Sequence, residues 1–369
     1  MSHHTVTRRR FLHGASALAT GLLAAPACGR RTFDDSVRGV LERLIATDRL
    51  PGALAVLTWP DGIVREFVSG QGLPQDASLR IASNTKTFTA TVVLQLVAEG
   101  RVALDAPVER YLPGLVSGNG NDGSAMTVRH LLQHTSGLHD YGAELTEHDP
   151  APHAAAELVA AALRHPPDFP PGSRWAYSNT GYQLAGMIVE RVTGGAVEDA
   201  VTSRIIEPLG LRRTYWPLFP EQHLRGPQPK AFRPSPGGRT EVRWINTSVV
   251  GCAGALVSTG AELNAFAGAL LGGRLLPDAQ LDEMTRTVPA EIVAGGAYGL
   301  GLVRHPLPGG GWFWGHGGSI EGTRTRGGVT SDGRAVTVAV NEIAATPDGS
   351  QHVVDAATAI FSDIRWETS

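Results

Sequence analysis

Apolar residues along this chain fall into two kinds of pattern, one typical of helices and one typical of strands. Apolar positions three and four residues apart predict helices over residues 33–46, 85–98, 127–134, 154–163, 180–192 and 351–360. Short runs rich in β-branched and aromatic residues predict strands over residues 53–58, 63–68, 312–314, 323–329 and 336–340. Asp61-Gly62 separates the first two runs and predicts a β-hairpin there.

The order of these elements predicts an α+β fold. Strands near both ends of the chain enclose a mostly helical middle, about residues 101–215. This order is typical of an antiparallel β-sheet flanked by helices, with an all-helical subdomain inserted between its strands. The stretch 225–239, rich in Pro and Gly, is expected to form a surface loop and not a domain linker. Residues 31–369 are therefore expected to form one structural unit.

The first thirty residues have the pattern of an export signal. Arginines at positions 8–10 precede an apolar run of small residues from Gly14 to Ala27, which is too short to span a bilayer. Residues 25–27 (Ala-Pro-Ala) fit a cleavage site. Twin arginines followed by Phe-Leu are typical of the twin-arginine pathway. We therefore expect residues 1–30 to be a signal peptide and the protein to be exported and extracellular.

The two cysteines do not form a disulfide framework. Cys28 directly follows the predicted cleavage site, where a lipoprotein carries its acylated cysteine. Ala25, however, is smaller than the aliphatic residue of a typical lipoprotein box, so a lipid-anchored and an unmodified Cys28 are both compatible with the sequence. Cys252 lies in a run of small apolar residues and is expected to be buried without a chemical role.

The charge balance excludes one class of partner and draws attention to one residue. With 32 basic and 35 acidic residues, the chain lacks the positive charge that nucleic-acid binding requires. Lysine occurs only at Lys86 and Lys230, and arginine supplies every other formal positive charge. A retained lysine is therefore a candidate for a task that arginine cannot perform, such as losing its proton.

Ser83-Asn84-Thr85-Lys86 is the first of three motifs with candidate chemistry. Residues three apart on a helix face the same way, so Lys86 can reach the Ser83 hydroxyl. A serine becomes nucleophilic beside a base, and a desolvated lysine can be that base. The helix N-terminus also favours negative charge that develops on a bound carbonyl. Taken alone, the pattern equally fits an N-cap serine followed by an exposed lysine.

Two shorter motifs follow. Tyr177-Ser178-Asn179 precedes a predicted helix; a tyrosine can act as acid or base, and a side-chain amide can hold a substrate carbonyl. His316-Gly317-Gly318-Ser319 follows the aromatic strand, and its glycines permit a sheet edge to approach a substrate closely. Each motif alone also fits a simpler interpretation: a loop tyrosine with a capping asparagine, or a hairpin turn with a bystander histidine.

Together, the three motifs resemble those of the serine β-lactamase and penicillin-binding protein family in order and in separation, about ninety and then about one hundred and forty residues. Tyrosine in the second motif and histidine in the third are similar to class C β-lactamase relatives. These include secreted D-alanyl-D-alanine carboxypeptidases, esterases and D-amino-acid peptidases. The likeness extends over residues 35–365, with further shared stretches at 80–88, 127–138, 169–172 and 298–301. The chain most resembles the actinobacterial carboxypeptidases.

The resemblance implies a catalytic mechanism. Ser83 attacks a carbonyl and forms an acyl-enzyme, while Lys86 and Tyr177 share the proton transfers. These two residues titrate as a unit, so the sequence leaves open which of them is the general base. Neither a metal nor another cofactor belongs to this mechanism.

A set of substrate-binding residues is also implied by the resemblance. The backbone N–H groups of the nucleophile and of Ser319 form an oxyanion hole. Asn179 positions the substrate amide, His316 holds the carboxylate end of the substrate or the tyrosine proton, and Gly318 keeps the strand close. Val303 departs from the family pattern, because the carboxypeptidases carry a basic residue before the third motif. Because of this departure, the substrate specificity of the carboxypeptidases is a weaker guide to this chain than their mechanism.

Other classes fit less well. An α/β-hydrolase needs G-x-S-x-G, and no serine here has both glycines. His130 and His134 are four residues apart, but no Glu follows His130 as H-E-x-x-H requires, so structural packing is favoured over a metal site. A non-catalytic penicillin sensor of the same family is a third class, against which the three intact motifs argue.

The sequence therefore predicts a serine hydrolase that acts on a small-molecule or peptide substrate. A D-alanyl-D-alanine carboxypeptidase is the leading hypothesis. A class C-like β-lactamase and a carboxylic esterase stay open, because a fold does not settle a substrate. We expect a monomer that requires no cofactor and binds no nucleic acid.

Overall fold

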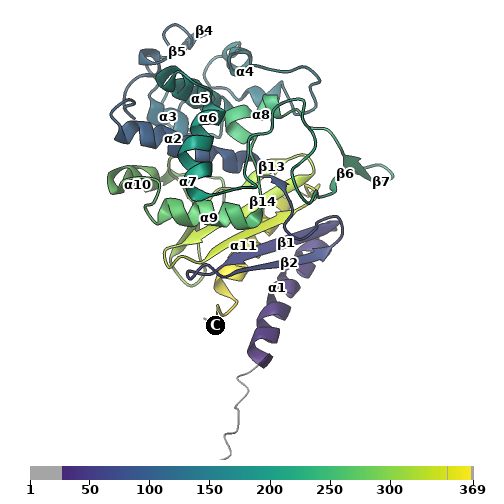
Figure 1. The fold of residues 1–369 in the computed structure, drawn as a ribbon. Helices are drawn as coiled ribbons and strands as arrows, with labels where there is room; N and C mark the ends of the chain where they lie inside the picture. The colour runs from purple at the N-terminus through teal and green to yellow at the C-terminus, as the bar shows by residue number, and fades with distance from the viewer. Residues whose placement is uncertain (1–26, 347, 367–369) are drawn as a thin grey trace, which may run out of the picture.

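A nine-stranded antiparallel β-sheet is the centre of the structure, a computed structural model that describes residues 27–346 and 348–366 (Figure 1). Eight strands follow one another in the order β2 (Val64–Gly70), β1 (Gly52–Thr58), β15 (Ala335–Val340), β14 (Thr323–Thr330), β12 (Trp312–Gly315), β11 (Val303–Pro306), β10 (Ala297–Tyr298) and β9 (Val288–Pro289). The ninth, β13 (Gly318–Ile320), pairs with β14. Strands from the two ends of the chain thus lie side by side, which confirms the predicted α+β fold class.

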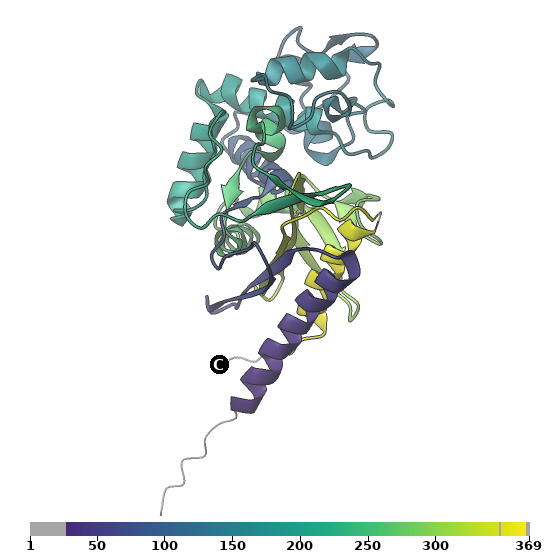
Figure 2. The same ribbon diagram turned by 90° about the vertical axis from the view of Figure 1, so that its right-hand side faces the viewer.

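The central strands are buried on both faces because helices cover both. Strand β1 directs Leu54 and Val56 into one apolar cluster, and Ala53, Ala55 and Leu57 into the other. The second cluster is covered by two helices that lie side by side, α1 (Ala27–Asp48) and α11 (Gly349–Ser362) (Figure 2). Helix α9 (Gly260–Leu271) packs on the opposite face of the sheet.

The other helices form a layer beyond α9, in the upper part of Figure 1. They are α2 (Thr85–Ala98), α3 (Val128–Gln133), α4 (Ala155–Leu163), α5 (Asn179–Thr193), α6 (Val197–Val201), α7 (Glu207–Leu209), α8 (Thr247–Gly254) and α10 (Asp278–Thr285). Short turns complete this part: η1 (Ala82–Asn84), η2 (Val108–Arg110), η3 (Tyr141–Ala143) and the π-helical η4 (Thr202–Ile206).

The predicted helical middle, about residues 101–215, contains α3 to α7. It is not entirely helical, because β4 (Ser117–Gly118) and β5 (Asn121–Asp122) form a small hairpin within it. The helical layer also reaches beyond this part of the sequence. Helix α8 comes later in the chain and packs on α2 and α5, and β8 (Val257–Ser258) then returns to pair with β3 (Leu79–Arg80).

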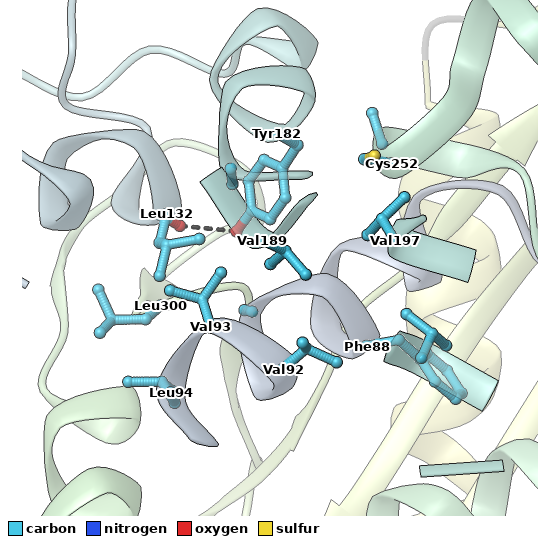
Figure 3. Close-up of a cluster of buried hydrophobic side chains, with 14 of the residues drawn as sticks. Phe88, Val92, Val93, Leu94, Leu132, Tyr182, Val189, Val197, Cys252 and Leu300 are labelled. Atoms are coloured by element: carbon cyan, nitrogen blue, oxygen red, sulfur yellow. Dashed lines mark hydrogen bonds between the residues drawn. The ribbon is translucent and has the colours of Figure 1, made fainter. Parts of the chain in front are cut away.

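Helix α2 is buried at the centre of this layer, with other helices packed around it (Figure 3). Its side chains are buried around most of its circumference, and Phe88 stacks on Phe266 of α9 with ring centroids 3.6 Å apart. A helix of this kind is stable only when other elements surround it. Above it, the Tyr182 hydroxyl of α5 donates to the Leu132 carbonyl of α3 at 2.7 Å. The first turn of α2, which carries the first motif, is therefore held in a packed core.

The stretch 225–239, predicted to be a loop, was assigned incorrectly in its second half. Strands β6 (Ala231–Ser235) and β7 (Gly238–Val242) form a hairpin closed by the Pro-Gly pair at 236–237. Phe232 N–H donates to the Asn341 carbonyl at 2.8 Å and attaches the hairpin to the end of the sheet. Proline and exposed polar residues conceal the strand pattern, and pairing within the hairpin decides the structure.

The predicted signal peptide lies outside the described residues, except where α1 begins at Ala27. Its twin arginines belong to that undescribed part, and the side chain of Cys28 is not described either. Within residues 27–346 and 348–366, no helix is long and apolar enough to cross a membrane. Cys252 is a buried free thiol, as its apolar surroundings in the sequence predict.

Candidate active site

A cleft of about 600 Å³ opens between the sheet and the helical layer. Residues of all three motifs line it: Ser83, Tyr177, Asn179, His316, Gly317 and Ser319. They come from the turn before α2, from the start of α5 and the residues just before it, and from the segment that leads from β12 into β13. Segments that are far apart in the sequence therefore meet at one site.

Ser83 lies in η1, directly before α2. The preceding residue, Ala82, has φ +45°, a conformation that non-glycine residues rarely adopt and that is often found beside functional groups. Lys86 Nζ donates to Ser83 Oγ at 3.1 Å, to Asn179 Oδ1 at 2.7 Å and to the Ala253 carbonyl at 2.8 Å. The three acceptors match the three protons of a lysine ammonium.

Burial determines the charge of Lys86. The side chain is fully buried, and this desolvation lowers its pKa from 10.5 to about 7, while the negative charge of Asp140 acts in the opposite direction. Lys86 therefore exchanges its proton near neutral pH. Its ammonium also lies over the ring of Tyr177, 4.7 Å from the centroid.

Tyr177 lies just before α5 with its hydroxyl near Ser83. Burial raises the pKa of the phenol well above its usual value, and a hydrogen bond with Ser83 lowers it in part. Tyr177 is thus a neutral hydrogen-bond donor at physiological pH. The ring of His316 lies across the cleft, with its centroid 6.4 Å from that of Tyr177.

Asp140, which belongs to none of the three motifs, completes a chain of hydrogen bonds. Asn179 Nδ2 donates to both carboxylate oxygens of Asp140, at 3.0 and 3.3 Å, while its Oδ1 accepts from Lys86. The amide is therefore oriented by an anion on one side and a cation on the other. Asp140 lies two residues after the shared stretch 127–138, which is the sequence signal that could have drawn attention to it.

His134 and His130 have separate packing roles. The His134 ring lies 4.2 Å from the Tyr177 ring, and its Nδ1 accepts from the Ser178 N–H at 3.2 Å. Burial holds the pKa of His134 well below its usual value, so the ring is neutral. His130 instead completes the capping box of Thr127 at the start of α3. Sequence reasoning had favoured packing for both and had not foreseen that His134 supports Tyr177.

His316 is neutral in this structure. Burial, followed by the charge of Lys86, lowers its pKa to about 3. Its Nδ1 donates to the Gly317 carbonyl at 2.6 Å, which leaves Nε2 to accept from the Tyr298 hydroxyl at 3.0 Å. A neutral imidazole is a weak partner for a substrate carboxylate, which was one of the two roles expected of His316.

Gly318 permits β13 to lie against the turn that carries Ser83. A Cβ at this position would come within 2.0 Å of the Ile81 carbonyl. Arg326, a residue the sequence analysis did not identify, is buried beside it and donates to the Gly318 carbonyl at 3.1 Å. Ser319 follows at the cleft, with its Oγ accepting from Arg324. The oxyanion hole formed by Ser83 and Ser319 stays a prediction.

The family model described as Beta-lactamase matches residues 37–357, nearly all of the described structure. The chain belongs to this family. Curated relatives include penicillin-binding protein 4 of Amycolatopsis lactamdurans, 34% identical over 48% of this chain and 47% of its own length. Esterase EstB of Burkholderia gladioli is 33% identical over 47% and 49%. This family member therefore aligns with about half the length of these curated relatives.

Solved structures of the family align over a larger part. The D-stereospecific amidohydrolase from Streptomyces sp. is 40% identical, with a TM-score of 0.80 over 88% of this chain and 98% of its own. The D-amino acid amidase of Ochrobactrum anthropi SV3 is 28% identical, with a TM-score of 0.81 over 89% and 98%. The predicted family is therefore confirmed, and this member has the fold of serine hydrolases that include penicillin-binding proteins, an esterase and amidases.

Proposed function

We propose that this protein is a serine amidohydrolase that cleaves D-configured substrates through an acyl-enzyme on Ser83. The observation that carries the proposal is the contact between Lys86 Nζ and Ser83 Oγ, 3.1 Å, at a cleft of about 600 Å³. A lysine whose pKa is about 7 can accept the serine proton at neutral pH. The likeness to a D-stereospecific amidohydrolase and a D-amino acid amidase supports the D configuration.

In this mechanism, Lys86 is the general base of acylation. Ser83 Oγ bonds to the substrate carbonyl carbon while its proton passes to Lys86 Nζ. The C–N bond then breaks, and the leaving amine takes a proton delivered through Tyr177, whose raised pKa keeps the phenol protonated. In the second half of the reaction, water bonds to the acyl carbon as its proton passes to Lys86 or Tyr177, and the bond between that carbon and Ser83 Oγ breaks as Oγ takes a proton back. The N–H groups of Ser83 and Ser319 are proposed to bind the oxyanion.

The chemistry of the cleft favours an amide with a free amino group. Apolar side chains line it (Leu145, Val249, Ile292 and Val293), and so do the carboxylates Glu147 and Glu291. An apolar D-side chain and a substrate ammonium complement such a lining. These features support an amino-acid amide or short peptide over the carboxypeptidase substrate first expected.

A D-alanyl-D-alanine carboxypeptidase is the second candidate, and Arg326 is the observation that favours it. Its guanidinium lines the cleft and is the type of group that binds a terminal carboxylate. However, Nη1 donates to the carbonyls of Gly318 and Thr325, and Nη2 to Ser350 Oγ. These bonds leave Arg326 fewer donors for a substrate, which places the carboxypeptidase second.

The test compares hydrolysis rates on D-phenylalanine amide, L-phenylalanine amide, an acyl-D-alanyl-D-alanine peptide, a chromogenic cephalosporin and a short acyl ester. We expect the highest kcat/KM on the D-amide, at least ~10² above its L enantiomer, and no turnover by Ser83→Ala. Equal rates on the two enantiomers contradict the proposed D specificity. A higher rate on the dipeptide supports the second candidate.

Covalent trapping tests the nucleophile separately from the substrate. A β-lactam resembles a strained acyl-D-alanyl-D-alanine, so we expect penicillin to acylate Ser83 at least transiently. Intact-protein mass spectrometry should show one drug adduct that maps to the Ser83 peptide. An adduct that persists in Ser83→Ala contradicts the assignment. A rapidly lost adduct favours β-lactamase activity, and a long-lived one favours a peptidase or amidase.

We also propose that the protein is exported by the twin-arginine pathway, as its N-terminal pattern indicates. Changing both Arg8 and Arg9 to Lys is expected to retain the precursor in the cytoplasm, because the pathway reads the arginine pair. Arg10→Lys is the control and is expected to be secreted normally. Normal secretion of the double variant points to the general secretory route instead.

A further inference from the structure

Two histidines and a carboxylate converge in the helical layer, outside the cleft. His139 lies before η3, Glu144 directly after it, and His165 after the end of α4. One ligand atom from each residue lies within 4.8 Å of the other two. We propose that His139, Glu144 and His165 bind a Zn²⁺ ion that has a structural role beside the active site.

The donor set suits Zn²⁺. Two imidazoles and one carboxylate are a common set of zinc ligands, with bonds of about 2.0–2.2 Å that bring ligand atoms within about 3.5 Å of one another. The rings of His139 and His165 already stack, with centroids 4.2 Å apart and planes inclined by 28°. His165 Nε2 contacts Glu144 Oε1. Since the lone pairs of an imidazole lie in the plane of its ring, the stacked rings must rotate about their side-chain bonds to direct both nitrogens toward one ion.

A second carboxylate orients one of the proposed ligands. Asp168 Oδ1 lies 3.2 Å from His139 Nδ1. An Nδ1–H that donates to Asp168 leaves the lone pair on Nε2 for a metal, which is the usual arrangement behind a zinc-binding histidine. Glu144 is similarly supported, because Arg164 pairs with Oε2 and leaves Oε1 on the side of His165.

Hydrogen bonds hold the backbones that carry these ligands. The His139 carbonyl accepts from Thr180 Oγ1 at 2.6 Å, and the His165 carbonyl accepts from Asn121 Nδ2 at 2.8 Å. The N–H of Asp168 donates to the Gly137 carbonyl at 2.8 Å, which joins the two segments directly. The backbone segments that carry the ligands are thus held in place, and binding requires little ordering of the main chain.

The proposed zinc site lies next to the hydrogen bonds of the active site, and the side chains of its ligands take no part in them. His139 and Glu144 enclose residues 140–143, which include Asp140, the partner of Asn179, and Tyr141, which lines the cleft. An ion bound to both ends of this segment holds it in place. The proposed role is therefore structural and independent of the nucleophile.

The experiment measures Zn²⁺ binding by the full chain after chelator treatment, in competition with a chromogenic chelator. His3 and His4 are changed to Ala in this parent, because adjacent histidines near the N-terminus bind metals on their own. We expect one Zn²⁺ per chain and micromolar or tighter affinity. Each of His139→Ala, Glu144→Ala and His165→Ala should weaken binding at least tenfold, and Asp168→Asn about tenfold.

Two controls make the outcome decisive. His148→Ala removes an exposed histidine of the same region that pairs with Glu321, and Ser83→Ala removes the nucleophile; both should bind Zn²⁺ like the parent. At one fixed Zn²⁺ concentration, the metal should raise the melting temperature of the parent and of both controls by the same amount, and that of His139→Ala by less. His165→Gln, closer in size, replaces any alanine variant that fails to fold by circular dichroism.

A parent that binds no Zn²⁺, or a His165 variant that binds it as tightly as the parent, overturns the proposal. In that case, the cluster is an ion pair between histidine and glutamate with no metal. Because binding and melting are measured without substrate, failure here leaves the proposed amidohydrolase activity untouched. Failure of that activity equally leaves the zinc site intact.

Discussion

At the scale of single residues, burial converts an ordinary lysine into a candidate base. Lys86 has no exposed surface, and its pKa of about 7 results mainly from that desolvation. The acceptors that surround it, Ser83, Asn179 and the Ala253 carbonyl, hold Nζ where a proton can pass to or from the nucleophile. Lys230, the other lysine, shows no such environment and provides a matched control.

Lys86→Arg should abolish proton transfer while keeping a positive charge, because arginine stays protonated at any accessible pH. We expect penicillin to acylate the variant at least ~10²-fold more slowly than the wild type. The larger side chain in a fully buried position should also cost about 1–3 kcal/mol of unfolding free energy. Stopped-flow acylation and chemical denaturation measure the two effects.

Lys230→Arg should change neither quantity. If Lys86→Arg acylates at the wild-type rate while it remains folded, Lys86 contributes only its charge, and another group is the general base.

The pH dependence of kcat/KM tests the same residue without altering it. Activity that needs neutral Lys86 should rise with pH, with an apparent pKa of about 7. The Asp140 carboxylate favours the charged lysine, so Asp140→Asn should lower this pKa and move the acid limb of the profile toward lower pH. Asp122→Asn, an exposed carboxylate in the β4–β5 hairpin, should leave the profile unchanged. A shift toward higher pH after Asp140→Asn contradicts the electrostatic account.

At the scale of elements, the site depends on the contact between β13 and the turn that carries Ser83. This contact is possible because residue 318 has no side chain, and because Arg326 holds the Gly318 carbonyl from the other side. The N–H of Ser319, proposed for the oxyanion hole, belongs to the same short strand. The position of β13 thus depends on the absence of a Cβ at residue 318.

Gly318→Ala should displace β13 from η1, because its Cβ would lie 2.0 Å from the Ile81 carbonyl. We expect kcat/KM to fall by ~10² or more, which is typical of losing an oxyanion donor. Gly309→Ala is the matched control, since its Cβ meets nothing within 4 Å and its φ is not positive. A wild-type kcat/KM in Gly318→Ala would show that β13 does not take part in binding the transition state.

At the scale of the whole molecule, the core contains several histidines that are neutral because they are buried. His305 and His316 both have a pKa of about 3, and that of His134 is also well below 6.5. The unfolded chain binds their protons at a higher pH than the folded one. The free energy of unfolding should therefore be largest above pH 6.5 and fall as the pH decreases from 6.5 toward 3.

Each such histidine contributes up to about 1.4 kcal/mol per pH unit over that range. His305→Phe should reduce the slope of unfolding free energy against pH, because it removes one titrating group and keeps a ring to stack on Phe313. His148→Ala, at an exposed histidine, should leave the slope close to the wild-type value. Denaturant titrations between pH 4 and pH 8 measure both, and an unchanged slope in His305→Phe contradicts the assignment.

The sequence by itself determined the elements and the family. Period and length of the apolar runs identified β1, α2, α5, β15 and α11 within a few residues, because these elements are long and patterned. The order of the three motifs identified the β-lactamase family, since each motif retains its local pattern. The spacing of the first motif placed Lys86 within reach of Ser83, because three residues make almost one turn of a helix, and the structure contains that contact.

The tertiary structure alone decided the electrostatics of the site. The pKa values of Lys86 and His316 result from burial by distant segments, which no local pattern encodes. Asp140 and Tyr298 complete hydrogen bonds across 39 and 18 residues of sequence. The two strands of the β6–β7 hairpin were missed for the same reason. Their own residues carry too little apolar pattern to specify a strand, and pairing with neighbours in space supplies the stability.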